Sequence, residues 1–241
     1  MRKAKYSFSV ITSTYNQLDQ LKRLREHLNN QEFTDYDRIV ADDGSNDGTD
    51  KWVKKNTDKY VFQHDFGYRL TKILNKAATE AEGEYLVWIM GDSYPQDDFL
   101  HMVDSHISPN TLASGIRINI DKKGKYHSHD WRIANIKDKL TEESLLVSGD
   151  NAYSSMTLNS MIMPTKMFNE MGGIHSGYDE GYGKMDWDMA AWAQYNGYDL
   201  KVFPKAIIYH DHHKERKDTD NNTKLFLERL EGFREVSDSN T

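Results

Sequence analysis

The stretch that decides the fold is RIVADDGSNDGT, residues 38–49, in which a short apolar run ends in two acids and a turn. A second stretch, GEYLVWIMGD at residues 83–92, has the same form, because its apolar run also leads to an acid, Asp92. Open α/β sheets bind ligands beyond the carboxyl ends of their parallel strands, so we expect Asp43 and Asp92 at the same edge of one sheet. One acid there suits a nucleotide base or ribose, and the other suits a divalent cation that holds a diphosphate. The two stretches therefore predict an enzyme that handles a nucleotide sugar.

Around these stretches the apolar residues alternate between strand spacing and helix spacing. The predicted elements of the first half are strands at residues 6–12, 38–41, 61–62 and 85–90, and helices that begin near Leu18, at Thr49 and at Leu70. The last of these, expected over residues 70–81, has the clearest apolar stripe. This repetition predicts an α/β fold with a Rossmann-like, mostly parallel central sheet flanked by helices.

The second half of the sequence is less regular. Its predicted elements are strands at residues 111–120, 200–203 and 206–209, and helices near residues 142–146, from Thr165, over residues 186–196 and over residues 225–233. No linker separates the halves, so we expect one domain, residues 1–236, with a nucleotide-binding half (1–104) and an acceptor-binding half (105–236). The polar residues 237–241 are expected to form a disordered tail.

The composition narrows the class of protein. With 241 residues, 37% of them hydrophobic, the chain is long enough to bury one core. A net charge of −7 disfavours a nucleic-acid partner, and the absence of cysteine leaves carboxylates and imidazoles as metal ligands. No apolar run reaches the 18 residues of a transmembrane helix, so we expect no transmembrane segment and a cytoplasmic location.

An ordered series of motifs gives the chain a family resemblance. The series is STYN (13–16), DDGSNDGT (42–49), GYR (67–69), MGD (90–92), GG (172–173), YDE (178–180), DWD (186–188) and YHDHH (209–213). In this order the motifs resemble family 2 glycosyltransferases of the GT-A fold, and their ending resembles chondroitin-polymerase-like, galactosyl- and N-acetylgalactosaminyltransferases. The resemblance implies metal-dependent, inverting transfer of a sugar from a UDP-sugar to a glycan or another hydroxyl-bearing acceptor.

On the donor side, the resemblance assigns Asp43 to a hydrogen bond with uracil or ribose, with Ser13 beside it. Tyr15 is a candidate for stacking on the base, and Arg69 for contacting base or phosphate through its planar fork. The alternatives are turn chemistry for Asp43, packing for Tyr15 and a surface ion pair for Arg69.

For the metal, Mn²⁺ or Mg²⁺, the best protein ligand is Asp92, because hard cations prefer oxygen and the acid directly follows a buried strand. His210 and His212 are both candidates for a second ligand, since alternate residues of an extended segment share a face. The alternatives are a turn cap before Pro95 for Asp92 and an exposed loop for the histidines.

On the acceptor side, the resemblance places Asp186 as the general base. Asn159, Asp179 and Trp187 are candidate sugar contacts, and Asp188 is a candidate to orient the acceptor. Helix capping is the alternative for Asp186 and Asp188. Residues 125–135 are a candidate lid or a solvated loop.

Two positions depart from the family pattern. Met90 stands where the first acid of the D-x-D motif belongs, and Met185 stands where a Glu is expected before Asp186. A catalytically silent nucleotide-sugar-binding homologue is therefore the main alternative. A nucleotidyltransferase would need a Gly-rich basic first loop, which STYN is not. The C-terminal helix is a candidate contact for the domain or for a second subunit of a homo-oligomer.

Overall fold

The computed structural model describes residues 4–56, 58–121, 123–132, 136–213, 217 and 219–239. Its ten strands are β1 (Tyr6–Thr14), β2 (Tyr36–Asp42), β3 (Lys59–Phe62), β4 (Gly83–Trp88), β5 (Ser93–Pro95), β6 (Thr111–Ile120), β7 (Tyr126–His129), β8 (Leu145–Val147), β9 (Met161–Pro164) and β10 (Asp199–Asp211). The α-helices are α1 (Leu18–Asn29), α2 (Thr49–Lys55), α3 (Leu70–Thr79), α4 (Phe99–His106), α5 (Thr165–Glu170), α6 (Met185–Tyr195) and α7 (Asp220–Ser239). Short 3₁₀ turns include η3 (Ala152–Ser155), η4 (Leu158–Ser160) and η5 (Ser176–Glu180).

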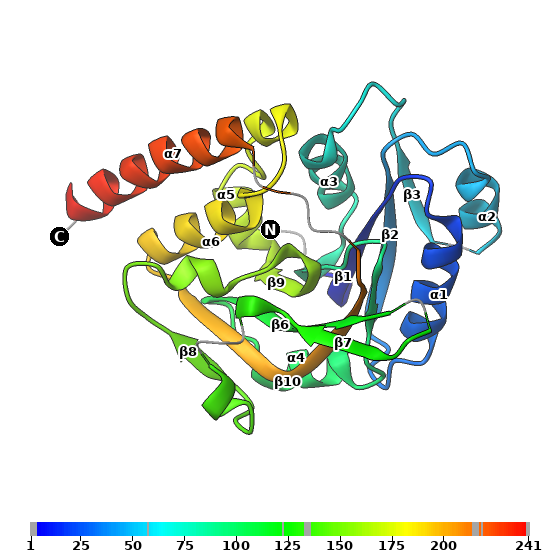
Figure 1. Ribbon diagram of the computed structural model, residues 1–241, viewed down its shortest axis with the longest axis horizontal. Helices are drawn as coiled ribbons and strands as arrows, with labels where there is room; N and C mark the ends of the chain where they lie inside the picture. Colours follow the sequence, from blue (N-terminus) through cyan, green and yellow to red (C-terminus); the bar gives the residue numbers. More distant parts are fainter. Residues whose placement is uncertain are drawn as a thin grey trace.

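The strands form one sheet in the order β3-β2-β1-β4-β9-β6-β10-β5, with β7 beside β6 and β8 beside β10 (Figure 1). Strands β3, β2, β1, β4, β6 and β10 run in the same direction, and β9 is inserted antiparallel between β4 and β6. The predicted α/β class with a mostly parallel central sheet is confirmed. Both predicted halves contribute strands to this one sheet, because β4 of the first pairs with β9 of the second.

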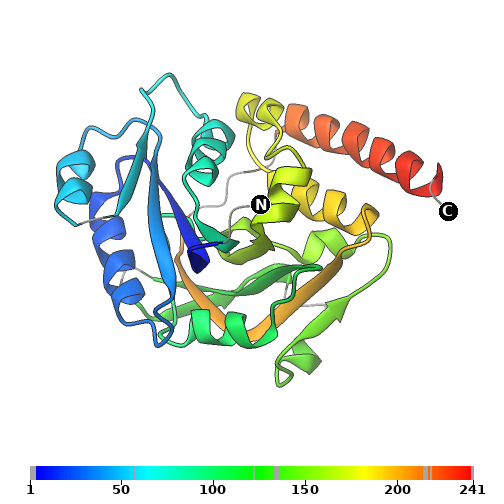
Figure 2. The same ribbon diagram turned by 180° about the vertical axis from the view of Figure 1, so that it is seen from behind.

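Helices cover both faces of the sheet. Alternate residues of β4 face opposite sides: Tyr85 and Val87 pack in one apolar cluster with α1 and α4, whereas Leu86 and Trp88 pack in another with α3, α5, α6 and α7. This two-sided burial explains the continuous apolar run of β4 in the sequence. Figure 2, from behind, shows α1 and α2 at one end of the sheet and α6 and α7 at the other.

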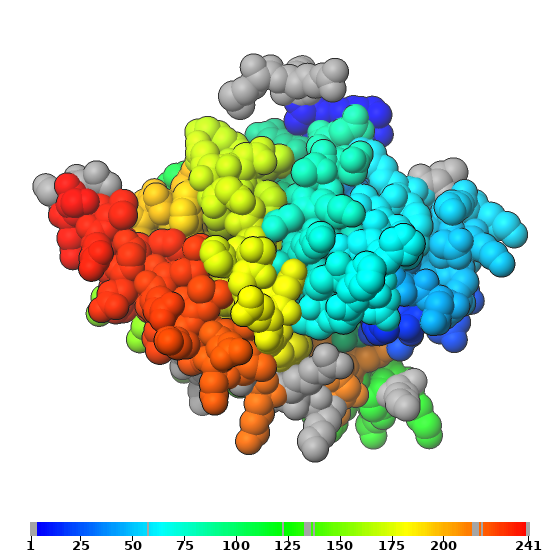
Figure 3. Space-filling view, turned by 90° about the horizontal axis from the view of Figure 1, so that it is seen from above, coloured from blue at the N-terminus to red at the C-terminus, as the bar shows by residue number. Residues whose placement is uncertain are grey.

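Helix α7 packs on the domain itself. Phe226 and Leu230 are buried in the cluster that holds α6, and Asn222 is fully buried. Figure 3 shows the start of α7 against the segment that contains η5, which in turn meets the residues of α3. Among the described residues, no helix is long and apolar enough to cross a membrane.

Several local predictions need correction. Residues 142–146 are not helical; Leu145 begins β8, which pairs with β10, so a tertiary partner decides its conformation. The two strands expected at 200–203 and 206–209 are one strand, β10, with a register irregularity between Phe203 and Ile207. Residues 237–239 belong to α7 rather than to a disordered tail, because helical bonding continues and the Ser239 hydroxyl donates to the Val236 carbonyl. Residues 240–241 lie outside the described part.

Candidate active site

A cleft of about 1480 Å³ lies at the carboxyl ends of the parallel strands. The end of β1, the loop after β2, the loop after β4 and the end of β10 all contribute to its wall. The predicted site residues that line the cleft are Ser13, Tyr15, Asp43, Asp92, Asn159, Asp186, Trp187, His210 and His212. Parallel strand direction therefore brings together residues that are as much as 199 positions apart in the sequence, from Ser13 to His212.

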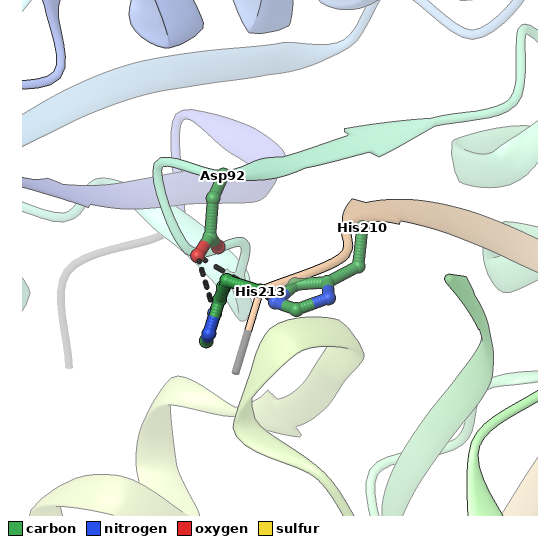
Figure 4. Close-up of side chains that lie close together, drawn as sticks. All are labelled: Asp92, His210 and His213. Atoms are coloured by element: carbon green, nitrogen blue, oxygen red, sulfur yellow. Dashed lines mark ion pairs between the residues drawn. The ribbon is translucent and has the colours of Figure 1, made fainter. Parts of the chain in front are cut away.

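Three side chains converge in this cleft as a candidate metal centre. The Oδ2 atom of Asp92 lies 3.5 Å from Nε2 of His210 and 3.4 Å from Nε2 of His213. Figure 4 shows dashed lines from the carboxylate to both imidazoles, and the three ligand atoms lie within 4.8 Å of one another. Neighbouring ligands of a divalent cation with bonds of about 2.1 Å are about 3 Å apart or somewhat more, so the group fits one shared cation.

The orientation of His210 suits metal binding. Its Nδ1 lies 3.0 Å from Oδ1 of Asn119, an oxygen that can only accept, so Nδ1 carries a proton and Nε2 is the ring atom that faces Asp92 and that a cation would take. Burial alone would raise the pKa of the Asp92 carboxyl, but hydrogen bonds and positive charge from His210 and His213 outweigh burial and hold its pKa well below the usual range. The centre is therefore built to keep Asp92 ionised.

We expect Asn119→Ala to weaken Mn²⁺ binding about 10- to 100-fold, the usual effect of losing the partner that orients a ligating histidine. Mn²⁺ titration calorimetry measures the effect. Ser128→Ala is the control. The Ser128 hydroxyl accepts a hydrogen bond from Nδ2 of Asn119 at 3.1 Å, so this change leaves the contact between Asn119 Oδ1 and His210 in place. Equal metal affinity of wild type and Asn119→Ala would contradict this role.

His213 replaces His212 as the third member of the centre. The prediction of His212 assumed an extended chain, but β10 ends at Asp211 and the alternation of faces ends with it. The His212 ring instead stacks on His127 with ring centres 3.7 Å apart, while its backbone N–H donates to the Ile120 carbonyl. His212 still lines the cleft. Only the sequence cluster of histidines pointed to His213.

Tyr15 and Asp43, the predicted contacts of base and ribose, both line the cleft. The Tyr15 side chain is 48% exposed, and its hydroxyl donates to Asp65 at 2.8 Å, which fixes the ring at the cleft wall. Asp43 accepts from Nε2 of Gln63 at 2.6 Å and from the backbone N–H of Arg69 at 3.0 Å. Each Asp43 oxygen keeps a further lone pair for a ligand.

Arg69 is not placed as predicted. It does not line the cleft; its guanidinium donates to the His64 carbonyl and lies over the Phe66 ring. The backbone of Arg69 rather than its side chain serves the site, by donating to Asp43. The Arg69 side chain, which we expected to contact base or phosphate, therefore binds within the local turn of residues 64–69.

Met90 occupies the position where the first acid of the D-x-D motif was expected, and it contacts Ser13. The Ser13 hydroxyl lies 3.2 Å from the Met90 sulfur, so both side chains are engaged with each other at the end of β1. The next residue must be glycine, because a Cβ atom at Gly91 would lie 2.5 Å from the Ser13 carbonyl oxygen. This close approach holds Gly91, the residue before Asp92, against the end of β1.

Asp186, which also lines the cleft, occupies the first turn of α6. Its Oδ2 lies 3.2 Å from Nη2 of Arg132, and its Oδ1 accepts from the backbone N–H of Trp187 at 3.0 Å. The Trp187 ring has the Lys184 ammonium 3.6 Å from its centre. Asn159, in η4, lies on the same cleft. A carboxylate, an indole and an amide thus line the same cleft.

Asp179 and Asp188 do not line the cleft, which differs from the predicted acceptor contacts. Asp179 accepts from the backbone N–H groups of Thr71 and Lys72 at 2.7 and 3.2 Å, and so caps α3. Asp188, with a side chain 2% exposed, pairs with Arg229 of α7 through bonds of 2.7 and 3.1 Å. Both acids hold helices in place.

We expect Arg229→Ala to lower the free energy of unfolding by about 3 kcal/mol, because the change leaves the Asp188 carboxylate buried without its cation. Chemical denaturation measures the difference. Lys224→Ala is the control, since Lys224 forms only an exposed pair with Glu228. If Arg229→Ala is no less stable than that control, the pair does not anchor α7.

An α/β sheet with helices on both faces and acids at its strand ends is typical of nucleotide-binding α/β folds. Comparison with known proteins narrows it: the family described as Glycosyl transferase family 2 matches residues 9–173, more than half of the chain. The chain therefore belongs to glycosyl transferase family 2.

Curated relatives agree with this assignment. Cholesterol galactosyltransferase of Borreliella burgdorferi is 31% identical over 102 residues, which cover 41% of this chain and 28% of that protein. Chondroitin synthase of Escherichia coli is 34% identical over 92 residues, which cover 36% of this chain and 13% of that protein. The matches thus span less than a third of each relative.

Solved structures support the fold. The structure of S. aureus TarS in complex with UDP superposes with a TM-score of 0.72 at 18% identity, covering 94% of this chain and 64% of that one. The structure of GalNAc-T7 with UDP, GalNAc and Mn²⁺ gives a TM-score of 0.73 at 14% identity, covering 94% and 48%. Together with the sheet order, these likenesses confirm the predicted GT-A fold.

Proposed function

We propose that this chain is a metal-dependent, inverting glycosyltransferase that moves a sugar from a UDP-sugar to a hydroxyl group of a saccharide or another acceptor. The observation that carries the proposal is that the Asp92–His210–His213 group and Asp186 line one cleft at the strand ends. The names of the galactosyltransferase and chondroitin synthase relatives, and the UDP and UDP-GlcNAc bound to TarS, support this class of reaction.

Asp92, His210 and His213 would hold the cation, and their oxygen and nitrogen atoms suit Mn²⁺ or Mg²⁺. When bound, such a cation acts as a Lewis acid that neutralises the charge of the departing diphosphate. The Tyr15 ring offers a stacking face for uracil, and Asp43 accepts a hydrogen bond from the base or ribose.

Asp186 is the proposed general base. Its carboxylate takes the proton of the acceptor hydroxyl while the acceptor oxygen forms a bond to the anomeric carbon. The bond from that carbon to the diphosphate oxygen breaks on the opposite side, and UDP leaves with the bonding electrons. Attack opposite the leaving group inverts the anomeric centre. Trp187 and Asn159 line the same cleft as Asp186 and are candidate contacts for the acceptor sugar.

The alternative is a catalytically silent homologue, which Met90 and Met185 favour. Against it, the cleft keeps a three-residue candidate metal centre although Met90 provides no carboxylate, since His213 contributes a ligand atom. Met185 borders the cleft, but it is only 6% exposed and packs in the core cluster of α6, which gives it a structural role at this position.

Titration calorimetry of UDP and GDP, with and without Mn²⁺, tests the donor site. We expect UDP to bind only with Mn²⁺ and more tightly than GDP; mass spectrometry of a panel of UDP-sugars with added saccharides then detects transfer. Mn²⁺-dependent UDP binding with no transfer across the panel would favour the silent homologue. Failure of both nucleotides to bind would refute the donor site itself.

A further inference from the structure

Helix α6 carries two acids two positions apart, and each faces an arginine from another element. Arg132, shortly after β7, pairs with Asp186 at 3.2 Å, and Arg229 of α7 pairs with Asp188 at 2.7 Å. Arg132 and Asp186 line the cleft, whereas the other pair lies outside its wall. The two pairs therefore have the same chemistry on the same helix but different surroundings.

Arg132 is itself held firmly. Its Nη1 lies 3.3 and 3.1 Å from the two carboxylate oxygens of Asp130, and its backbone N–H donates to Asp130 Oδ1 at 2.9 Å. Asp130 is 4% exposed and also pairs with Arg117 of β6 at 2.6 Å. The order of charges along Arg117, Asp130, Arg132 and Asp186 alternates in sign. A partly buried chain of ion pairs that is centred on the buried Asp130 fixes the guanidinium relative to the central sheet.

The contacts of Asp186 fix its carboxylate plane. One oxygen faces Arg132 and the other accepts from the Trp187 N–H, so rotation about the side chain would break both bonds. We propose that Arg132 is a positioning residue: it ties the carboxylate of Asp186 to the sheet through Asp130 and Arg117, with the remaining lone pairs directed to the acceptor. This inference rests on the proposed role of Asp186 as the general base.

Arg132→Ala tests the inference, with transfer measured for whichever donor and acceptor pair the panel identifies. We expect kcat to fall about 100-fold, the order of loss caused by a misplacement of about 1 Å. KM for the UDP-sugar and calorimetric UDP–Mn²⁺ affinity should stay at wild-type values. Millimolar guanidinium should restore part of kcat, and Arg132→Lys should retain more of it than Arg132→Ala.

Arg229→Ala is the matched control, assayed below its lowered melting temperature, with Arg229→Lys in reserve if the alanine variant does not fold. It should lower thermal stability, keep wild-type kcat and give no response to guanidinium. If Arg132→Ala keeps wild-type kcat while Asp186→Asn is inactive, the positioning role is overturned and the base assignment stands. If Asp186→Asn is as active as wild type, the proposed base itself fails.

Discussion

Asp186→Asn is expected to lower kcat for sugar transfer by about 10³-fold, within the range that a positioned general base supplies. The substitution keeps the shape of the side chain and the oxygen that can face Arg132, but an amide cannot accept the proton of the acceptor hydroxyl. Binding of UDP with Mn²⁺ should be unchanged, because the metal centre is formed by other residues. Single-turnover transfer and calorimetry of UDP measure the two quantities separately.

Asp188→Asn is the matched control for that substitution. Asp188 is the next acid on the same helix, two residues further on; it accepts a hydrogen bond from Tyr178 at 3.0 Å and pairs with Arg229 away from the cleft. We expect this variant to lose stability and to keep most of its kcat when folded. Equal losses of kcat in both variants would show that any change to the acids of α6 lowers activity. The loss in Asp186→Asn would then be no evidence that Asp186 is the base.

The first half of the fold, and the position of Asp43 and Asp92 on one cleft, followed from the sequence because their determinants are local. A parallel strand buried on both faces must be apolar throughout, so the run before Asp92 was recognisable. The acids after β2 and β4 then had to meet at one sheet edge, as Asp43 and Asp92 do. Likewise, the apolar stripe of residues 70–79 alone was sufficient to indicate α3.

Other assignments depended on tertiary partners that no local pattern reveals. Asp188 has the same sequence context as Asp186, and only the position of Arg229 on α7 separates a buried ion pair from a cleft acid. Asp179 resembled an acceptor contact but caps a helix that lies more than 100 residues earlier in the chain. The Arg132–Asp186 pair was equally hidden, since residues 125–135 showed no regular periodicity.

The same reasoning explains the exchange of His212 for His213. A strand pattern predicts faces only while the backbone stays extended, and β10 ends at Asp211, after His210 and before both His212 and His213. The Tyr94 hydroxyl donates to Asp211 at 2.6 Å, and Arg23 pairs with it at 3.2 Å, so Asp211 is anchored toward α1 and β5. The side-chain directions of His212 and His213 therefore depend on how Asp211 is held and not on strand alternation.

Asp92→Ala is expected to abolish Mn²⁺-dependent binding of UDP, with a loss of affinity above the 10- to 100-fold that follows loss of a supporting residue. Among the residues that the structure describes, Asp92 provides the only carboxylate of the centre, and the two imidazoles that remain are neutral as ligands, so the cation would lose its anionic ligand from the protein. Calorimetry of UDP at fixed Mn²⁺, and of Mn²⁺ alone, measures the loss.

His213→Ala should give a smaller loss, because one oxygen and one nitrogen ligand persist. His212→Ala is the matched control, since its ring stacks on His127 and it should bind Mn²⁺ as the wild type does. A metal loss in His212→Ala equal to that in His213→Ala would return His212 to the centre, whereas wild-type UDP binding by Asp92→Ala would show that nucleotide binding in this cleft needs no cation at Asp92.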